Sequence, residues 1–200
     1  MITTVLVLPS PPALLAPRSV HDPVAELRQA CAVAVSTLPE ERPVVVLAAP
    51  LSEANAARGV TEPLGHRVAA ALLGGTPFEP RLALPCAAVA LLEVSEPMTL
   101  VVMADGSARR DEKAPGHLHP DAVPFDERIE AALRSGDAET LAALDPEVGE
   151  ELWCEGVRGL RTLGEVARGR GVVGHVSYAD APYGVAWWVA RWDLTRRDLA

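Results

Sequence analysis

The sequence contains 200 residues, of which 49% are apolar and 22% are charged, a composition far from that of a disordered chain. A chain of this length buries roughly 70% of its extended surface, so it needs neither a disulfide nor a metal to hold a core. The formal net charge of −9 argues against a nucleic-acid or anionic-membrane partner, because acidic side chains outnumber the Lys and Arg that would neutralise phosphates.

The first half of the chain alternates short apolar runs with helical patterns. Residues 5–8, 44–48 and 100–103 are continuous runs rich in valine and leucine, a pattern typical of strands that are covered on both faces in a largely parallel sheet. Between the first two runs, Asp22 followed by a proline predicts a helix N-cap with proline at the first helical position. Between the second and third runs, Pro63 predicts the start of a helix that a glycine pair ends.

The second half begins with a long irregular stretch, residues 105–124, which is rich in glycine and proline. A loop of this length inside a compact domain is more often functional than idle. A helix that begins near Phe125 and ends at a glycine follows it, and Asp137 and Asp145 then predict the N-caps of further helices. The chain finishes with two predicted strands, residues 172–178 and 184–192.

Strands that alternate with helices predict an α/β fold. We expect a three-layer sandwich in which a central, mostly parallel or mixed sheet is flanked by helices. Because their apolar patterns match, the strands near Val5, Val45 and Val101 are predicted to be neighbours in one sheet. No internal repeat and no linker rich in serine and glycine divides the chain, so we expect a single domain over residues 1–200.

The cysteines and the apolar run at the N-terminus indicate where in the cell the protein is expected. Cys31, Cys86 and Cys154 lie among apolar neighbours without a short paired spacing, which predicts buried, reduced thiols in a cytosolic protein. The N-terminal apolar run stops at Pro9 and has no basic segment before it, so it is too short for a signal peptide or a membrane span. We therefore expect a cytoplasmic protein with no membrane partner.

Three blocks, in this order along the chain, carry a family resemblance. The first is Pro-Ser-Pro-Pro at residues 9–12, after the first strand. The second is Val-Val-Met-Ala-Asp-Gly-Ser-Ala-Arg-Arg at residues 101–110, followed by Lys-Ala-Pro-Gly, and the third is Ala-Pro-Tyr-Gly-Val at residues 181–185. Together they resemble the actinobacterial branch of the class III extradiol ring-cleavage dioxygenase B-subunit superfamily, whose fold the Memo proteins share. The resemblance extends over nearly the whole chain, and the second and third blocks are its specific part.

The resemblance implies where a metal site would be. In active members of that superfamily, two His and one Glu hold a non-haem Fe(II), and a third His serves as acid/base. The resemblance puts the first His position at Ser10 or Pro11 and the second at Leu51-Ser52. It puts the acid/base position at Ala108. Since a hydroxyl is a weak Fe(II) ligand and proline, leucine and alanine side chains are none, we expect no Fe(II) or Zn(II) there.

Two functions from different classes remain open, with a third beside them. The first is a degenerate, metal-free relative of these dioxygenases that acts as a small-molecule-binding or interaction domain, with no cofactor. The alternative is an enzyme, either an atypical Fe(II) extradiol dioxygenase or another activity in the same cleft. Only in the dioxygenase case would iron be the cofactor, with Glu151 or Glu155 as the nearest carboxylate ligand. The third is a structural homo-oligomer.

The candidate cleft follows from the sheet. Open α/β sheets collect ligands at the carboxyl ends of their strands, where loops leave and backbone groups are free to point inward. Asp105 supplies a carboxylate there, although it could instead cap a turn through its own side chain. A ring of hydroxyls with one carboxylate and one phenol suits hydrogen bonding to a polar small molecule. The predicted cleft residues are Ser10, Pro11, Ser52, Asp105, Ser107 and Tyr183.

The five histidines give no strong alternative metal site. His117 and His119 alone have ligand-like spacing, and we predict that they are solvated loop residues that share no metal. His66 is predicted at the surface or boundary of its helix, and His21 is predicted to be exposed. His175 lies in a predicted strand, where we expect a hydrogen-bonded core histidine.

Overall fold

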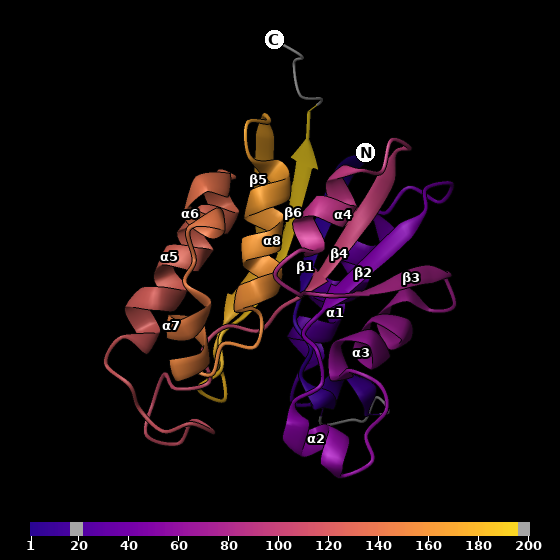
Figure 1. Cartoon of the computed structure of the whole chain (residues 1–200). Coiled ribbons are helices and arrows are strands. Elements are labelled where there is room, and N and C mark those ends of the chain that lie inside the picture. Colours follow the sequence, from indigo (N-terminus) through magenta and orange to yellow (C-terminus); the bar gives the residue numbers. More distant parts are fainter. Residues whose placement is uncertain (17–21, 196–200) are drawn as a thin grey trace.

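The middle layer of the fold is a six-stranded mixed sheet with the order β3-β2-β4-β1-β6-β5. The computed structural model describes residues 1–16 and 22–195 (Figure 1). The four N-terminal strands run parallel to one another, and the last two are antiparallel to their neighbours. The strands are β1 (Ile2–Leu8), β2 (Val44–Ala48), β3 (Phe78–Leu82), β4 (Met98–Met103), β5 (Val172–Asp180) and β6 (Trp187–Leu194).

Helices cover both faces of this sheet, so the fold is the three-layer α/β sandwich that the sequence predicts (Figure 1). One layer contains η1 (Pro12–Leu15), α1 (Ala25–Ser36), the short α2 (Glu53–Ala57) and α3 (Leu64–Leu73). The other contains α4 (Ala87–Leu92), α5 (Ala122–Ser135), α6 (Ala138–Ala142), α7 (Pro146–Glu151) and α8 (Val157–Ala167).

Two apolar clusters, one on each face, make up the core. Side chains alternate along a strand, so Val5 and Val7 of β1 pack with α5, α6 and α8, whereas Leu6 and Leu8 pack with α1 and α3. The predicted neighbourhood of the three apolar strands is confirmed, because β4 pairs in parallel with both β1 and β2. These strands are buried along nearly their whole length, which is why their sequences show continuous apolar runs.

Several predicted helix ends are confirmed by their capping geometry. Pro63 is the N-cap of α3, and Gly136 ends α5 in the left-handed conformation. The side chain of Asp137 accepts from the backbone N–H of Thr140, three residues on, at the start of α6. The side chain of Asp145 accepts from the backbone N–H of Glu147, two residues on, at the start of α7.

The start of α1 was predicted too early. The helix begins at Ala25, and Asp22 instead closes the turn before it, where its Oδ1 accepts from Val24 N at 3.1 Å. The same carboxylate pairs with Arg28 Nε at 2.7 Å, which fixes the turn against the first turn of the helix.

Three predictions of side-chain exposure are wrong. His66 is buried, with Nε2 3.0 Å from Arg81 O, because the unpredicted edge strand β3 covers it. His175 is exposed on the other edge strand, β5, rather than in the core. Cys86 is exposed, whereas Cys31 and Cys154 are buried thiols as expected. The prediction for His21 falls outside the described residues.

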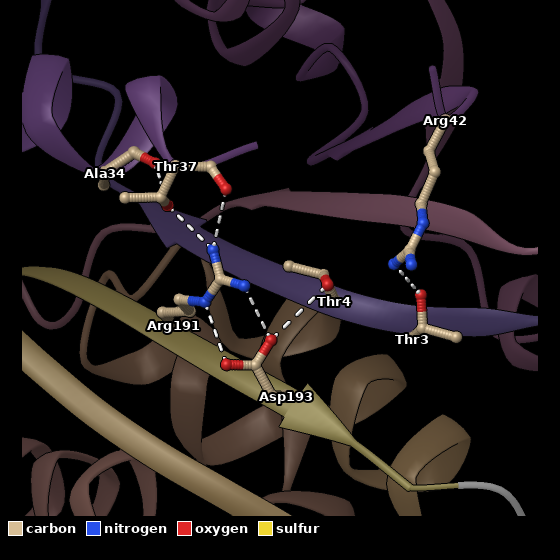
Figure 2. Close-up of polar contacts among 7 residues, drawn as sticks. All are labelled: Thr3, Thr4, Ala34, Thr37, Arg42, Arg191 and Asp193. Atoms are coloured by element: carbon tan, nitrogen blue, oxygen red, sulfur yellow. Dashed lines mark hydrogen bonds and ion pairs between the residues drawn. The ribbon is translucent and has the colours of Figure 1, made fainter. Parts of the chain in front are cut away.

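An arginine on β6 ties the end of α1 to the sheet (Figure 2). Arg191 Nη1 donates to Thr37 Oγ1 at 2.7 Å and to Thr37 O at 3.1 Å. The same guanidinium pairs with Asp193, whose Oδ1 in turn accepts from Thr4 Oγ1 of β1 at 3.5 Å. The network therefore links β1, β6 and α1 across the antiparallel junction of the sheet (Figure 2).

The closest helix contact gives a stability prediction. A Cβ on Gly164 of α8 would overlap the backbone N of Ala142 and lie 2.7 Å from Ala138 O, so α6 and α8 meet at this glycine. We expect Gly164→Ala to lower the free energy of unfolding by about 1–3 kcal/mol in denaturant titrations. Gly159→Ala is the matched control, because it gains the same helix propensity on α8 and meets only Val102 Cγ1 at 3.0 Å. Equal effects of the two substitutions would contradict the tight crossing.

Candidate functional site

The carboxyl ends of β1 and β4 bring a serine and an aspartate together. Because these strands are parallel neighbours with Leu8 beside Met103, the residues that follow them meet at one edge of the sheet. Ser10 N donates to Asp105 Oδ1 at 3.0 Å, and Ser10 Oγ donates to Asp105 Oδ2 at 2.7 Å. The alternative, in which Asp105 caps its own turn, is wrong, since both carboxylate oxygens accept from the neighbouring strand's loop.

Two adjoining hollows meet at Asp105 and form one cleft. Both are lined by Asp105, Glu150, Cys154 and Glu155. The larger, which we call the Trp153 hollow, has a volume of about 440 Å³ and is otherwise lined by Gly106, Ala108, Pro115, Trp153 and Val185. The second, which we call the Ser10 hollow, has a volume of about 330 Å³ and extends past Ser10, the segment 49–52, Asn55 and Arg158. Their sizes are those of small-molecule sites.

The carboxyl group of Asp105 is the most perturbed acid of the cleft. Burial raises its pKa to about 6, the two hydrogen bonds from Ser10 oppose that rise, and the charge of Glu155 adds to it. A carboxyl group with a pKa close to neutral can exchange a proton with a ligand at physiological pH. Cys154 is different: burial raises its thiol pKa well above the usual value, so it stays protonated, and its Sγ donates to Asp105 O at 3.4 Å.

Trp153 forms an exposed aromatic wall of the larger hollow. Its backbone has φ of 55°, a left-handed conformation that a bulky residue seldom adopts, and its side chain is 54% exposed. The ring lies against Gly116, where a Cβ would come within 3.1 Å of Trp153 Cδ2. Trp153 was not among the predicted cleft residues. Its acidic neighbours Glu150, Glu151 and Glu155 are a signal in the sequence, since a core aromatic seldom has such neighbours.

Buried polar contacts hold the loop between β4 and α5 in place, and Ser107 makes several of them. Ser107 is fully buried: its Oγ donates to Leu152 O at 2.8 Å and accepts from Arg109 N at 3.1 Å. Ser107 N donates to Asp126 Oδ1 at 2.9 Å, and Asp126 pairs with Arg110 at 2.9 Å. Burial raises the pKa of Asp126 to about 6 as well. Ser107 therefore pins the loop instead of facing the cleft, and its predicted position was wrong.

The remaining predicted cleft residues divide into two groups. Ser52 lines the Ser10 hollow while its Oγ caps α2 by accepting from Asn55 N at 3.3 Å. Pro11 is buried before η1 and lines neither hollow. Tyr183 is exposed, with its ring centroid 5.8 Å from that of Trp187, and it also lines neither hollow. The structure thus brings together Ser10, Ser52 and Asp105 only.

The donors at this cleft do not fit the Fe(II) that the family resemblance implies. No imidazole lines either hollow, both oxygens of Asp105 accept from Ser10, and the Cys154 thiol is held protonated. Within residues 1–16 and 22–195, no group of three His, Cys, Asp or Glu side chains could hold a metal ion. His119 lies with Nε2 3.5 Å from Glu151 Oε1, outside the two hollows.

Comparisons with known proteins bear on the fold alone. No family model and no curated protein matches the chain. The crystal structure of the uncharacterized protein JW3007 from Escherichia coli K12 is similar over 96% of this chain and 99% of that one. The TM-score is 0.54 and the sequence identity is 14%, so the likeness shows a shared α/β architecture. Among the described residues, no helix combines the length and the apolar character needed to cross a membrane.

Proposed function

We propose that the chain is a metal-free relative of the class III extradiol dioxygenases that binds a small molecule at the carboxyl ends of β1, β2 and β4. The kinship rests on the three sequence blocks, and the binding rests on one observation. That observation is the meeting of two hollows at Asp105, one with an aromatic wall and one whose lining includes Ser10, Ser52 and Asn55. We also propose a cytoplasmic location, because the three cysteines are free and one of them is exposed, which suits a reducing compartment.

The lining indicates the kind of molecule that fits. Trp153, Pro115 and Val185 give the larger hollow an apolar wall on which a flat ligand can lie. Asp105 is a hydrogen-bond acceptor in the lining of this hollow, so the ligand should carry a hydroxyl or amine donor. Glu150 and Glu155 line both hollows as further carboxylates, and Glu150 is paired with Arg158 at 2.6 Å.

The metal-free part of the proposal is tested by elemental analysis of untagged protein. We expect far less than one iron or zinc per chain and no ring-cleavage product from catechols, because the cleft offers no imidazole ligand. One bound iron per chain together with extradiol product would refute this part and restore the dioxygenase alternative.

A second candidate function, a metal-independent enzyme, is favoured by one specific observation. The pKa of Asp105, raised to about 6 inside a ligand-sized cleft, suits general acid–base catalysis near neutral pH. The Ser10 hydroxyl would hold the carboxylate in place during proton transfer. This candidate shares the cleft of the first proposal and differs only in whether the bound molecule is changed.

The binding proposal predicts which substitutions abolish ligand hits. We expect a library of small planar molecules with amine or hydroxyl donors to give thermal-shift hits against the parent protein. Trp153→Ala should weaken those ligands about tenfold or more, since it removes the aromatic wall. Tyr183→Ala is the matched control, because Tyr183 is an aromatic residue that is 49% exposed but lines neither hollow. Hits that survive Trp153→Ala would place binding elsewhere.

The raised pKa of Asp105 predicts a pH dependence of stability. The folded chain holds this proton more tightly than the unfolded chain does, since the pKa rises from 3.8 to about 6. The stabilising contribution is therefore full below the unfolded pKa and is lost as pH rises through 6. Asp105→Asn should be more stable than the parent at high pH, by about 1–3 kcal/mol, and the advantage should shrink in acid.

Urea titrations at about pH 5 and about pH 8 measure this difference. Asp126 keeps its own raised pKa in both proteins, so its contribution cancels in the comparison. A variant that is equally destabilised at both pH values would mean that Asp105 has an ordinary pKa.

A further inference from the structure

A segment without a single charged side chain lies at the surface. Residues 83–92, which include α4, read Ala-Leu-Pro-Cys-Ala-Ala-Val-Ala-Leu-Leu. Val89 is 61% exposed, and Leu84 and Leu92 are each 45% exposed. Pro85 and Cys86 between them are exposed too. We call Leu84, Pro85, Cys86, Val89 and Leu92 the α4 patch.

The α4 patch is not an ordinary scatter of surface apolar residues. A surface helix usually turns a polar face to water, but α4 has no polar residue to turn. Ala88 and Leu91 are buried in the core cluster that α8 shares, which leaves Val89 and Leu92 outside. Four of the eleven exposed large apolar side chains of the described residues fall between Leu82 and Leu92. Contiguous apolar surface of this kind marks an interaction site.

We propose that the α4 patch is the centre of a twofold interface between two copies of this chain. With a net charge of −9, two copies repel one another over most orientations. The residues of the α4 patch carry no charge, so two copies that meet there bury no charged side chain of the patch itself. A twofold contact also places the same surface on both sides, so an uncharged, apolar surface is complementary to itself.

Side chains around the α4 patch carry both signs of charge. Glu79 and Arg81 lie on the neighbouring edge strand β3, where they form an exposed ion pair. Arg161 and Glu165 of α8 line a hollow of about 210 Å³ that Leu84 and Pro85 complete. We call these four charged residues the rim. In a twofold arrangement, each cation of the rim can face an anion of the other copy, which favours pairing in one orientation.

The α4 patch alone is too small for a stable interface, so the rim must contribute buried area. A stable interface buries about 800 Å² on each partner, more than five apolar side chains provide, so the rim from β3 and α8 must take part. β3 itself is a short edge strand with Pro80 within it, so the contact is made by side chains rather than by continuation of the sheet. Because Cys86 belongs to the α4 patch, the proposed contact is expected to bring it near the Cys86 of the other copy.

The oligomeric state of the full chain and of charge variants tests this interface. In sedimentation or light scattering at micromolar concentration, we expect the parent to have twice the mass of a single chain. Val89→Glu and Leu92→Glu should each raise the dimer dissociation constant about tenfold or more. Val33→Glu is the matched control, because Val33 is 52% exposed on α1 and the change in charge is the same. It should leave the dimer intact.

The exposed thiol gives a second readout that does not depend on mass. Cys86 is the exposed cysteine of the three, so a short bis-maleimide should link two copies through it in the parent and not in Val89→Glu. A monomeric parent would overturn the proposal. A dimer that Val89→Glu leaves intact and that Cys86 does not cross-link would overturn it as well, since another face would then be the interface. Circular dichroism of each variant verifies that it is folded.

Discussion

The parallel pairing of β1 with β4 places Leu8 beside Met103, and the geometry of the cleft depends on that register. Strands that leave the sheet at the same edge bring their next residues together, so Ser10 and Asp105 meet although 95 residues separate them. The start of α8 lies against the same point. Gly156 N donates to Asp105 O at 3.1 Å, and a Cβ at this glycine would come within 2.5 Å of that oxygen. Sheet, loop and helix therefore converge on one aspartate.

That convergence explains why the carboxylate of Asp105 is fixed in position and why its pKa is raised. Removing a carboxylate from water is unfavourable, and the two donors of Ser10 offset only part of the loss, so its pKa rises to about 6. The pKa of Asp126 on α5 is raised by burial too, and the hydrogen bonds from Arg110 and Ser107 N of the adjoining loop oppose that rise. Such buried acids are less stabilising than apolar residues of similar shape, and they are typical of sites kept for binding or chemistry.

The sequence predicts the central strands well because β1, β2 and β4 are buried on both faces and show it as continuous apolar runs. β3 escapes prediction, since an exposed edge strand reading Phe-Glu-Pro-Arg-Leu has neither alternation nor a continuous run. His66 was misplaced for the same reason, as its cover is β3.

At the cleft, Ser10 and Asp105 were accessible to prediction because they directly follow strands. The orientation of Ser107 was not, since its hydroxyl is directed by Leu152 O, 45 residues away. Trp153 depends on a left-handed backbone conformation that no local pattern of the sequence announces.

The antiparallel addition of β6 to β1 has a consequence for synthesis on the ribosome. β1 is made first, yet one of its edges pairs with β6, so that Thr4 lies beside Asp193. Until residues 187–194 leave the exit tunnel, a strand buried along most of its length in the finished fold has an open edge. Contacts this distant in sequence close slowly, and an incomplete sheet of this kind can pair with a neighbouring nascent chain. The last hairpin, β5 with β6, thus closes the open edge of β1 and completes the sheet.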